Sequence, residues 1–367
     1  MISSVFNEIN LIKMNEKQII ELIKFTQMIK GFKIVKSSEI YNELVSYAKN
    51  GATRGKYLGF PEFHKYYSMA LGVTTDWTGI PQSGKTQVLM ECLLNTSEWY
   101  GWKHLVYFPD VGDAKEILAD LIHKRSGKTF DKRYKNHITD FEISAHSDWI
   151  CEHFFILTKE DLKSQLSPIE FWDMGVEMSL NIQGGLQTMS VDSWKDLKHD
   201  TSSFGRDDKY LEYVLSYRNA IAEKYNMHIN IVIHPTRTDK DEKGKRKPPS
   251  PYHLKGGTEW FNNGKCMITV HRPDGSKNEV HIMVTKAKPR SVAKRGVYKA
   301  YFDLEKFRYY NWINGEKRYA EQKSIEEIEE LEREYESDVD SIGTLENNQK
   351  NQSIVSNIET EDDDLPF

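Results

Sequence analysis

The pattern of apolar and polar residues changes near residue 57. Residues 1–50 have helical spacing, with apolar side chains such as Ile19 and Ile23 among lysines and glutamates. From about Tyr57 to Tyr310, short apolar runs alternate with longer stretches of helical pattern. The clearest apolar runs cover residues 105–108, 229–233 and 280–284. This alternation predicts an α/β fold with a central, mostly parallel sheet flanked by helices.

Three regions follow from this pattern. Residues 1–56 are expected to form a helical N-terminal arm that packs on a neighbour or on the next domain, because the arm is too short and polar to enclose its own core. Residues 57–320 are expected to form one large domain. Residues 321–367 start with a Glu-rich helical pattern and continue, from residue 337, with polar residues and few apolar ones. That composition predicts an acidic helix followed by a disordered tail.

Charge is distributed unevenly over these regions. The 367-residue chain has a formal net charge of −5. Residues 321–367 hold sixteen acidic and three basic residues, which leaves +8 for the preceding 320 residues. A basic body suits a polyanionic ligand, although a modest excess of lysine is also common on ordinary soluble domains.

The cysteines and the apolar runs exclude several classes of protein. Cys92, Cys151 and Cys266 lie far apart without a CxxC pair, which argues against a structural zinc site and for a reducing compartment. The longest apolar stretches, such as residues 154–157, are far shorter than the ~20 residues that cross a bilayer. The N-terminus also lacks the layout of a signal peptide. We expect a soluble cytoplasmic protein with no membrane partner.

The sharpest local signal is the sequence GIPQSGKT at residues 79–86, which fits GxxxxGK[ST] at every fixed position. Such a loop turns its backbone N–H groups toward phosphate oxygens and opens into a helix whose positive end favours the same anion. Lys85 would reach the β- and γ-phosphates, and Thr86 would place its hydroxyl on Mg²⁺. A chance match in an unrelated loop is the alternative. The remaining residues of the predicted nucleotide site in this loop are Gly79, Pro81, Gln82, Ser83 and Gly84.

A second stretch, SGKT at residues 126–129, repeats part of the pattern. Ile122 occupies the position of the first glycine, within a helical pattern, so we do not expect a phosphate loop there.

Nucleotide hydrolysis also needs a carboxylate near the metal and a group that orients the attacking water. Asp192 ends a moderately apolar strand pattern and is the natural carboxylate on the metal side. Asp110 closes the strand pattern that starts at residue 105, one strand–helix unit after the loop, and can face the γ-phosphate. For both aspartates, a turn or helix cap is the alternative.

The spacing of these and further segments resembles the RecA-like motor domain of DnaB-type ring helicases, most closely the Twinkle and bacteriophage branch. The similarity covers residues 59–310, most of the chain. Of these segments, only the phosphate loop would be a specific signal by itself, but all the segments together are specific for this family. The segments are GIPQSGKT at 79–86, YGWK at 100–103 with YFPD at 107–110, VDSWKDLKH at 191–199, IVIHP at 231–235, WFNN at 260–263, TVHR at 269–272 and VTKAK at 284–288.

The resemblance implies further roles. His234 corresponds to the residue that senses the γ-phosphate and relays its loss to a DNA-binding loop. Lys286 and Lys288 correspond to basic fingers that enter the nucleotide site of the neighbouring subunit. Arg272 and Tyr309 correspond to the pair that sandwiches the base. The alternatives are a structural histidine, surface lysines and a core tyrosine.

Two residue types depart from the family pattern. Asp110 stands where the family usually has Glu, and the shorter carboxylate would slow hydrolysis. The finger is Lys286-Ala287-Lys288 instead of Lys-x-Arg, with Arg290 two residues further on. Because lysine lacks the bidentate fork of arginine, either Arg290 substitutes or the finger is weaker.

The segment 236–257 follows the expected sensor and is basic and irregular. Its position is where ring helicases carry the loop that tracks single-stranded DNA, and phosphate contacts from lysine and arginine are independent of sequence. A plain solvated loop is the alternative. The resemblance also implies a closed ring, most simply a hexamer. The basic residues are Arg237, Lys240, Lys243, Lys245, Arg246, Lys247 and Lys255.

The last residues resemble the acidic tip of bacterial single-stranded-DNA-binding proteins, a docking peptide whose terminal aromatic enters a pocket. This resemblance implies docking of replication proteins such as primase or polymerase, with a solubilising tail as the alternative. The docking residues would be Asp362, Asp363, Asp364, Leu365, Pro366 and Phe367.

Two hypotheses follow. The first is an ATP-dependent replicative DNA helicase of a bacterial or phage-infected cell, hexameric and 5′–3′ by resemblance, with priming supplied by another chain. The second is a RecA-like DNA-binding ATPase, recombinase-like or a recruitment factor, without robust unwinding.

Overall fold

A computed structural model describes residues 37–50, 54–161, 163–242, 244–275 and 277–340. The chain divides into two units at residues 53 and 54. In the first unit the described part is the helix α3 (Ser37–Asn50). None of the described helices is both long and apolar enough to pass through a membrane.

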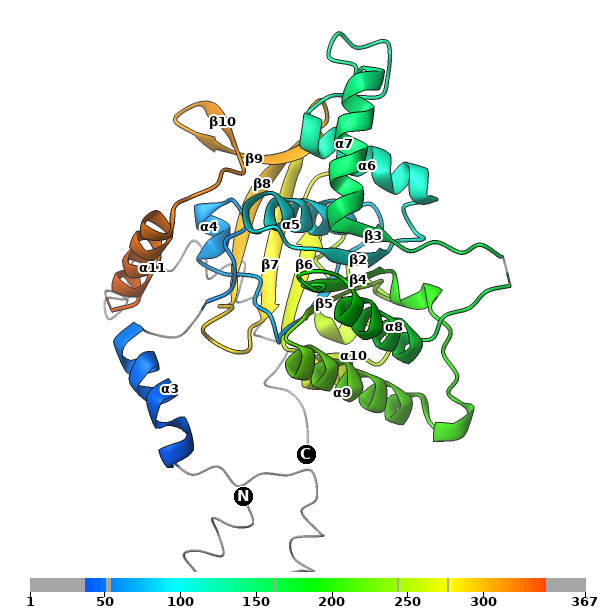
Figure 1. The fold of residues 1–367 in the computed structure, drawn as a ribbon, viewed down its shortest axis with the longest axis vertical. Helices are drawn as coiled ribbons and strands as arrows, with labels where there is room; N and C mark the ends of the chain where they lie inside the picture. The colour runs from blue at the N-terminus through cyan, green and yellow to red at the C-terminus, as the bar shows by residue number, and fades with distance from the viewer. Residues whose placement is uncertain (1–36, 51–53, 162, 243, 276, 341–367) are drawn as a thin grey trace, which may run out of the picture. The chain divides into compact units, whose positions relative to one another are not determined.

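One sheet organises the second unit, and its ten described strands are ordered β10-β9-β8-β7-β6-β1-β5-β4-β2-β3 (Figure 1). The six strands β6, β1, β5, β4, β2 and β3 pair in parallel. The pairs β6–β7, β7–β8, β8–β9 and β9–β10 are antiparallel. The strands are β1 (Thr74–Thr78), β2 (His104–Tyr107), β3 (Phe154–Ile156), β4 (Thr188–Asp192), β5 (His228–Ile233), β6 (Cys266–His271), β7 (Glu279–Lys286), β8 (Gly296–Asp303), β9 (Arg308–Ile313) and β10 (Glu316–Tyr319).

Helices cover both faces of the parallel half. Residues of α5 (Lys85–Tyr100), α6 (Ala114–Ser126) and α7 (Asp140–His153) belong to one apolar cluster, and residues of α8 (Pro168–Asn181), α9 (Asp207–Tyr225) and α10 (Gly257–Asn263) belong to the other. Figure 1 shows these two groups of helices on opposite sides of the sheet. The shorter helices are α4 (Pro61–His64), η2 (Trp194–Asp196), η3 (Ser202–Phe204) and η4 (Pro251–His253), and α11 (Ile325–Asp340) follows the last strand.

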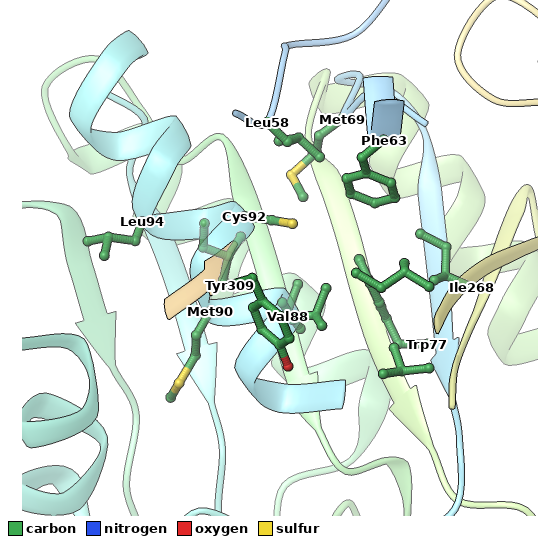
Figure 2. Close-up of a cluster of buried hydrophobic side chains, with 14 of the residues drawn as sticks. Leu58, Phe63, Met69, Trp77, Val88, Met90, Cys92, Leu94, Ile268 and Tyr309 are labelled. Carbon is green, nitrogen blue, oxygen red and sulfur yellow. The ribbon is translucent and has the colours of Figure 1, made fainter. Parts of the chain in front are cut away.

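The two clusters exist because side chains alternate between the faces of a strand. On β5, Val232 packs in the first cluster, whereas Ile231 and Ile233 pack in the second. Figure 2 shows part of the first cluster, where Tyr309 of β9 lies beside Val88 and Met90 of α5, and Trp77 of β1 lies beside Ile268 of β6. Because both faces are covered, every residue of β1, β4 and β5 is buried.

Local signals explain where the helices start. Asp113, Thr139 and Ser167 each begin a helix with a capping box, in which the side chain accepts the N–H of a glutamate three residues later. Gly101 ends α5 and Gly127 ends α6, both with left-handed backbone. The second SGKT stretch is therefore the end of α6, as expected for a segment that is not a phosphate loop.

The predicted α/β architecture is confirmed, but the sheet is mixed. The sequence pattern anticipated the parallel strands around β1, and it did not anticipate the antiparallel hairpins from β7 to β10. A Glu-rich helix, α11, occupies the start of the predicted acidic region, and Tyr335 on it donates a hydrogen bond to the Pro61 carbonyl at 2.5 Å. The predictions for residues 1–36 and for the tail, 341–367, lie outside the described residues.

Candidate nucleotide-binding site

The phosphate-loop sequence lies between β1 and α5, at the carboxyl end of β1. Gly79 has φ +153°, and a Cβ there would collide with the carbonyl oxygen of Val270 on β6. Gly84 has φ +95° and caps the N-terminus of α5, and a Cβ there would come within 2.7 Å of the Tyr309 hydroxyl. Both positions therefore require glycine. The N–H groups of the loop lie at the N-terminus of α5, a 16-residue helix whose dipole is positive at this end.

The polar groups of the loop fit a phosphate ligand. Lys85 is buried, and its Nζ donates to the Ile80 carbonyl at 3.1 Å. Burial lowers the pKa of Lys85, although Asp192 and Asp110 oppose this shift. The hydroxyls of Thr78 and Ser83 are buried without a hydrogen-bond partner among the described residues. A bound anion would give the two hydroxyls an acceptor and would give the ammonium group of Lys85 a partner of opposite charge.

The metal side of the site joins α5 to β4. The Thr86 hydroxyl donates a hydrogen bond to the carboxylate of Asp192, which ends β4. Asp192 is 1% exposed, and its burial raises the pKa of its carboxyl despite the bond from Thr86 and the charge of Lys85. A hydroxyl oxygen next to a carboxylate is the donor set that Mg²⁺ prefers, so these two residues fit the predicted metal.

A second carboxylate lies on the neighbouring strand end. Asp110 follows β2, and it accepts hydrogen bonds from Nε2 of His234 at 2.8 Å and from Nζ of Lys195 at 3.0 Å. Partial burial would raise the pKa of Asp110, but these two bonds outweigh it and the pKa is lowered. Ligand atoms of Asp110, Asp192 and His234 lie within 4.8 Å of one another. The structure thus brings together the two aspartates and the histidine that the sequence singled out separately.

Lys195 is a residue that the sequence reasoning missed. It lies on η2, three residues after Asp192, inside a segment that the resemblance already included. The segment follows β4 at the carboxyl edge of the sheet, and this position was the signal that could have identified Lys195 as a site residue. Its side chain is 60% exposed, so solvent reaches the ion pair with Asp110.

A cavity of about 480 Å³ is lined by Lys85, Thr86 and the cluster of Asp110, Asp192 and His234. Arg272 lines it, and Nε of Arg272 is buried without a hydrogen-bond partner among the described residues. Leu304, in the turn after β8, adds an apolar wall that is 66% exposed, and nothing in its sequence surroundings predicted this place. The lining residues are Pro81, Gln82, Gly84, Lys85, Thr86, Gln87, Asp110, Val111, Asp120, Asp192, His234, Arg272, Phe302, Leu304 and Tyr309.

Tyr309 lines this cavity, and its side chain is almost entirely buried. Its ring is 2% exposed and packs in the first apolar cluster next to Val88 (Figure 2). Its hydroxyl donates to the carbonyl of Gly84 at 3.2 Å. Side chains of the first apolar cluster, Val88 of α5 among them, surround most of the ring. Arg272 and Leu304 are the side chains open to the cavity on this side.

The three predicted finger residues have different environments. Lys286, which ends β7, is 7% exposed, with its Nζ 4.7 Å from the ring centre of Phe261 and 3.4 Å from the Asn262 carbonyl. Burial, and after it the charge of Lys288, lowers the pKa of Lys286 to about 8. Lys288 and Arg290 are exposed. None of the three is among the described residues that line the cavity of their own chain.

The basic segment begins two residues after His234, which directly follows β5, and it has more order than predicted. Pro235 pairs with Leu254, and Lys240 pairs with Arg246, so the segment doubles back on itself. Lys255 forms an ion pair with Asp207 at 3.1 Å. Lys243 lies outside the described residues. The exposed basic residues are Arg237, Lys240, Lys245, Arg246, Lys247 and Lys255.

Comparisons with known proteins agree with this geometry. No protein-family model matches the chain. Over 240 residues the sequence is 22% identical to the Twinkle homolog protein, chloroplastic/mitochondrial, of Arabidopsis thaliana, and the match covers 64% of this chain and 33% of that protein. The chain thus spans about a third of the length of this relative.

Two solved structures share the fold. An ATPase domain matches with a TM-score of 0.64 and 15% identity, over 77% of this chain and 100% of the other. A DnaB-like replicative helicase, described together with its interactions with primase, matches with a TM-score of 0.61 and 16% identity, over 80% of this chain and 73% of the other. The chain therefore carries a RecA-like ATPase-domain fold that resembles those of DnaB-like helicases, and its sequence resembles a Twinkle homologue.

Proposed function

We propose that this chain is an ATP-dependent replicative DNA helicase motor that requires Mg²⁺. One observation carries the proposal. Asp110 and His234 are hydrogen-bonded to each other in the cavity that the phosphate loop also lines, and the basic segment begins two residues after His234. A change at the phosphates can therefore reach a DNA-binding surface through one side chain. The resemblance to DnaB-like and Twinkle proteins supports the same function.

Each residue of the site has a chemical task in this proposal. Lys85 and the N–H groups of the loop would hold the phosphates, and Arg272, which lines the same cavity, would contact the base. Thr86 and Asp192 would hold Mg²⁺, which when bound neutralises phosphate charge. Asp110 accepts a hydrogen bond from the attacking water. With its lowered pKa it is a weak base, so its main contribution is to orient the water.

The same proposal assigns the basic segment to single-stranded DNA. Its exposed lysines and arginines would contact phosphates without reading sequence. We place Lys288 and Arg290 at the nucleotide site of a neighbouring copy, where added positive charge stabilises the transferring phosphoryl group. Lys286 is packed against Phe261, so it would support this finger from within its own chain. The working assembly is a closed ring, a hexamer, that moves 5′–3′.

A DNA-binding ATPase without robust unwinding, recombinase-like or a recruitment factor, is the second candidate. The short carboxylate of Asp110 and the burial of Lys286 favour it, because both reduce the groups available for fast hydrolysis. Electron micrographs with ATP and single-stranded DNA separate the two, since closed rings support the helicase and open filaments support the recombinase-like alternative.

Partner binding rests on the sequence of the C-terminal tip. We propose that residues 362–367 dock replication proteins such as primase or polymerase through their carboxylates and the terminal Phe367.

Replacing Lys85 is expected to abolish hydrolysis. Lys85→Ala removes the cation that contacts the phosphates, and a fall of at least about a hundredfold in the ATPase rate follows from losing one such group. Lys128→Ala is the matched control, because Lys128 sits in the second SGKT stretch and pairs with Glu142. ATP turnover and unwinding of a forked duplex are measured on both variants. Full turnover by Lys85→Ala would disprove the site, and turnover without unwinding by the wild type would favour the second candidate.

Neutralising the basic segment is expected to weaken DNA binding. Replacing Lys245, Arg246 and Lys247 by Ala removes three phosphate contacts, so the slope of log K against log salt for single-stranded DNA falls by about 2. The same three-charge loss at Lys132, Arg133 and Lys135, in the loop before α7, serves as the control and leaves the slope unchanged. Equal slopes for both triple variants would show that the basic segment does not contact DNA.

Deleting residues 362–367 is expected to leave the ATPase rate of the isolated protein unchanged and to abolish binding of its replication partners. Pull-down of purified primase and polymerase tests this, with Leu365→Ala together with Phe367→Ala as the variant that keeps the charge. Undiminished capture by the deleted protein would assign the tail a solubilising role.

A further inference from the structure

Tyr309 stands at a junction between the antiparallel half of the sheet and the phosphate loop. Its hydroxyl donates to the carbonyl of Gly84, the residue that caps α5. The same carbonyl also accepts the N–H of Val88 at 3.0 Å, the first hydrogen bond of that helix. Two donors therefore fix the direction of the Gly84 carbonyl, one from the helix and one from β9.

The direction of that carbonyl decides where the next N–H points. The carbonyl of Gly84 and the N–H of Lys85 belong to one planar trans peptide group and point in opposite directions. Holding the carbonyl toward Tyr309 therefore turns the Lys85 N–H away from Tyr309. In a loop of this kind such N–H groups bind phosphate oxygens, so a rotation of this peptide would spoil the cradle.

Tyr309 is itself held by a buried charged cluster. Glu91 on α5 accepts the backbone N–H of Tyr309 at 3.1 Å and Nε of Arg308 at 3.0 Å. Arg308 also donates to Asn95 at 2.6 Å. Lys124, fully buried on α6, lies 3.6 Å from Glu91 and donates to the Phe307 carbonyl at 2.8 Å. Contacts from two helices, α5 and α6, thus fix the position of β9 next to the start of α5.

We propose that Tyr309 is a positioning residue for the phosphate loop, acting through its hydroxyl on Gly84 rather than through its ring on the base. This inference rests on the proposed nucleotide site and adds a residue that holds it in shape. It also assigns a function to the antiparallel strands, because β9 carries the side chain that fixes the loop.

The chemistry of the phenol suits this role. Burial, with a further contribution from Glu91, raises the pKa of Tyr309 above its ordinary value. The hydroxyl therefore stays protonated at neutral pH and donates to the carbonyl. Removing the oxygen would leave the ring and its packing in place, and this permits a clean test.

The test compares Tyr309→Phe with Tyr298→Phe. Tyr298 lies in the same apolar cluster, and its hydroxyl donates to Asn311 at 3.1 Å, away from the loop. Binding of MgADP and MgGDP is measured by calorimetry on both variants and on the wild type, and thermal unfolding reports whether each variant is folded. We expect Tyr309→Phe to lower the affinity for both nucleotides about tenfold, which is equivalent to about 1.4 kcal/mol of binding free energy. Tyr298→Phe is expected to bind like the wild type.

Hydrogen exchange supplies a second readout that a role in base stacking would not change. In Tyr309→Phe without nucleotide, amides of the peptide covering residues 79–88 are expected to exchange faster than in Tyr298→Phe. If Tyr309→Phe does not fold, Glu91→Gln replaces it in the test. This variant removes the charge that holds Arg308 and Lys124, and it is expected to lower the affinity for MgADP as well.

The outcomes separate the inference from the proposed function. Wild-type affinity and exchange in Tyr309→Phe would overturn the positioning role. A third variant, Tyr309→Leu, also lacks the aromatic ring, and weaker nucleotide binding by this variant alone would favour base stacking instead. Wild-type protein that binds neither nucleotide would instead overturn the nucleotide site itself.

Discussion

The structure depends on the constraint that adjacent parallel strands end at the same edge of the sheet. The strands β1, β5, β4 and β2 are neighbours in this half of the sheet, and each is followed by one part of the site. The phosphate loop follows β1, His234 follows β5, Asp192 ends β4 and Asp110 follows β2. The shared edge thus brings together residues that lie far apart in the sequence. Open α/β sheets generally bind ligands at this edge.

Burial gives the site its chemical asymmetry. Asp192 is enclosed and its pKa is raised, whereas Asp110 is partly exposed and its pKa is lowered by Lys195 and His234. The two carboxylates therefore differ in function despite being close together. The enclosed one suits a metal that would replace its missing partner charge, and the solvated one suits contact with water.

The sequence predicted the parallel half of this fold well, because two of its signals are local. The glycines of the loop are fixed by the left-handed backbone at Gly84 and the close approach of Val270 to Gly79, so their spacing alone indicates the turn. Asp110 and Asp192 were recognisable because each ends an apolar run. The order of the strands in the sheet then placed them together, as the topology of such folds requires.

The features that the sequence did not predict depend on contacts that no local pattern encodes. Tyr309 lies in a run of aromatic residues on β9, and the sequence does not say which of them faces α5 and which faces the cavity. Lys286 looks like any surface lysine until Phe261 and Asn262 of α10 are seen to cover it. The antiparallel strands were missed for a related reason, since short apolar runs do not reveal the direction of their partners.

The central claim is that the Asp110–His234 contact couples the nucleotide site to the basic segment. The most direct measurement is the ratio of the ATPase rate with saturating single-stranded DNA to the rate without it, in His234→Ala and in His281→Ala, a control whose histidine lies on β7 beside Glu279. The account predicts that His281→Ala is stimulated like the wild type, while His234→Ala binds DNA with unchanged affinity and loses the stimulation. Normal stimulation of His234→Ala by DNA would contradict the account.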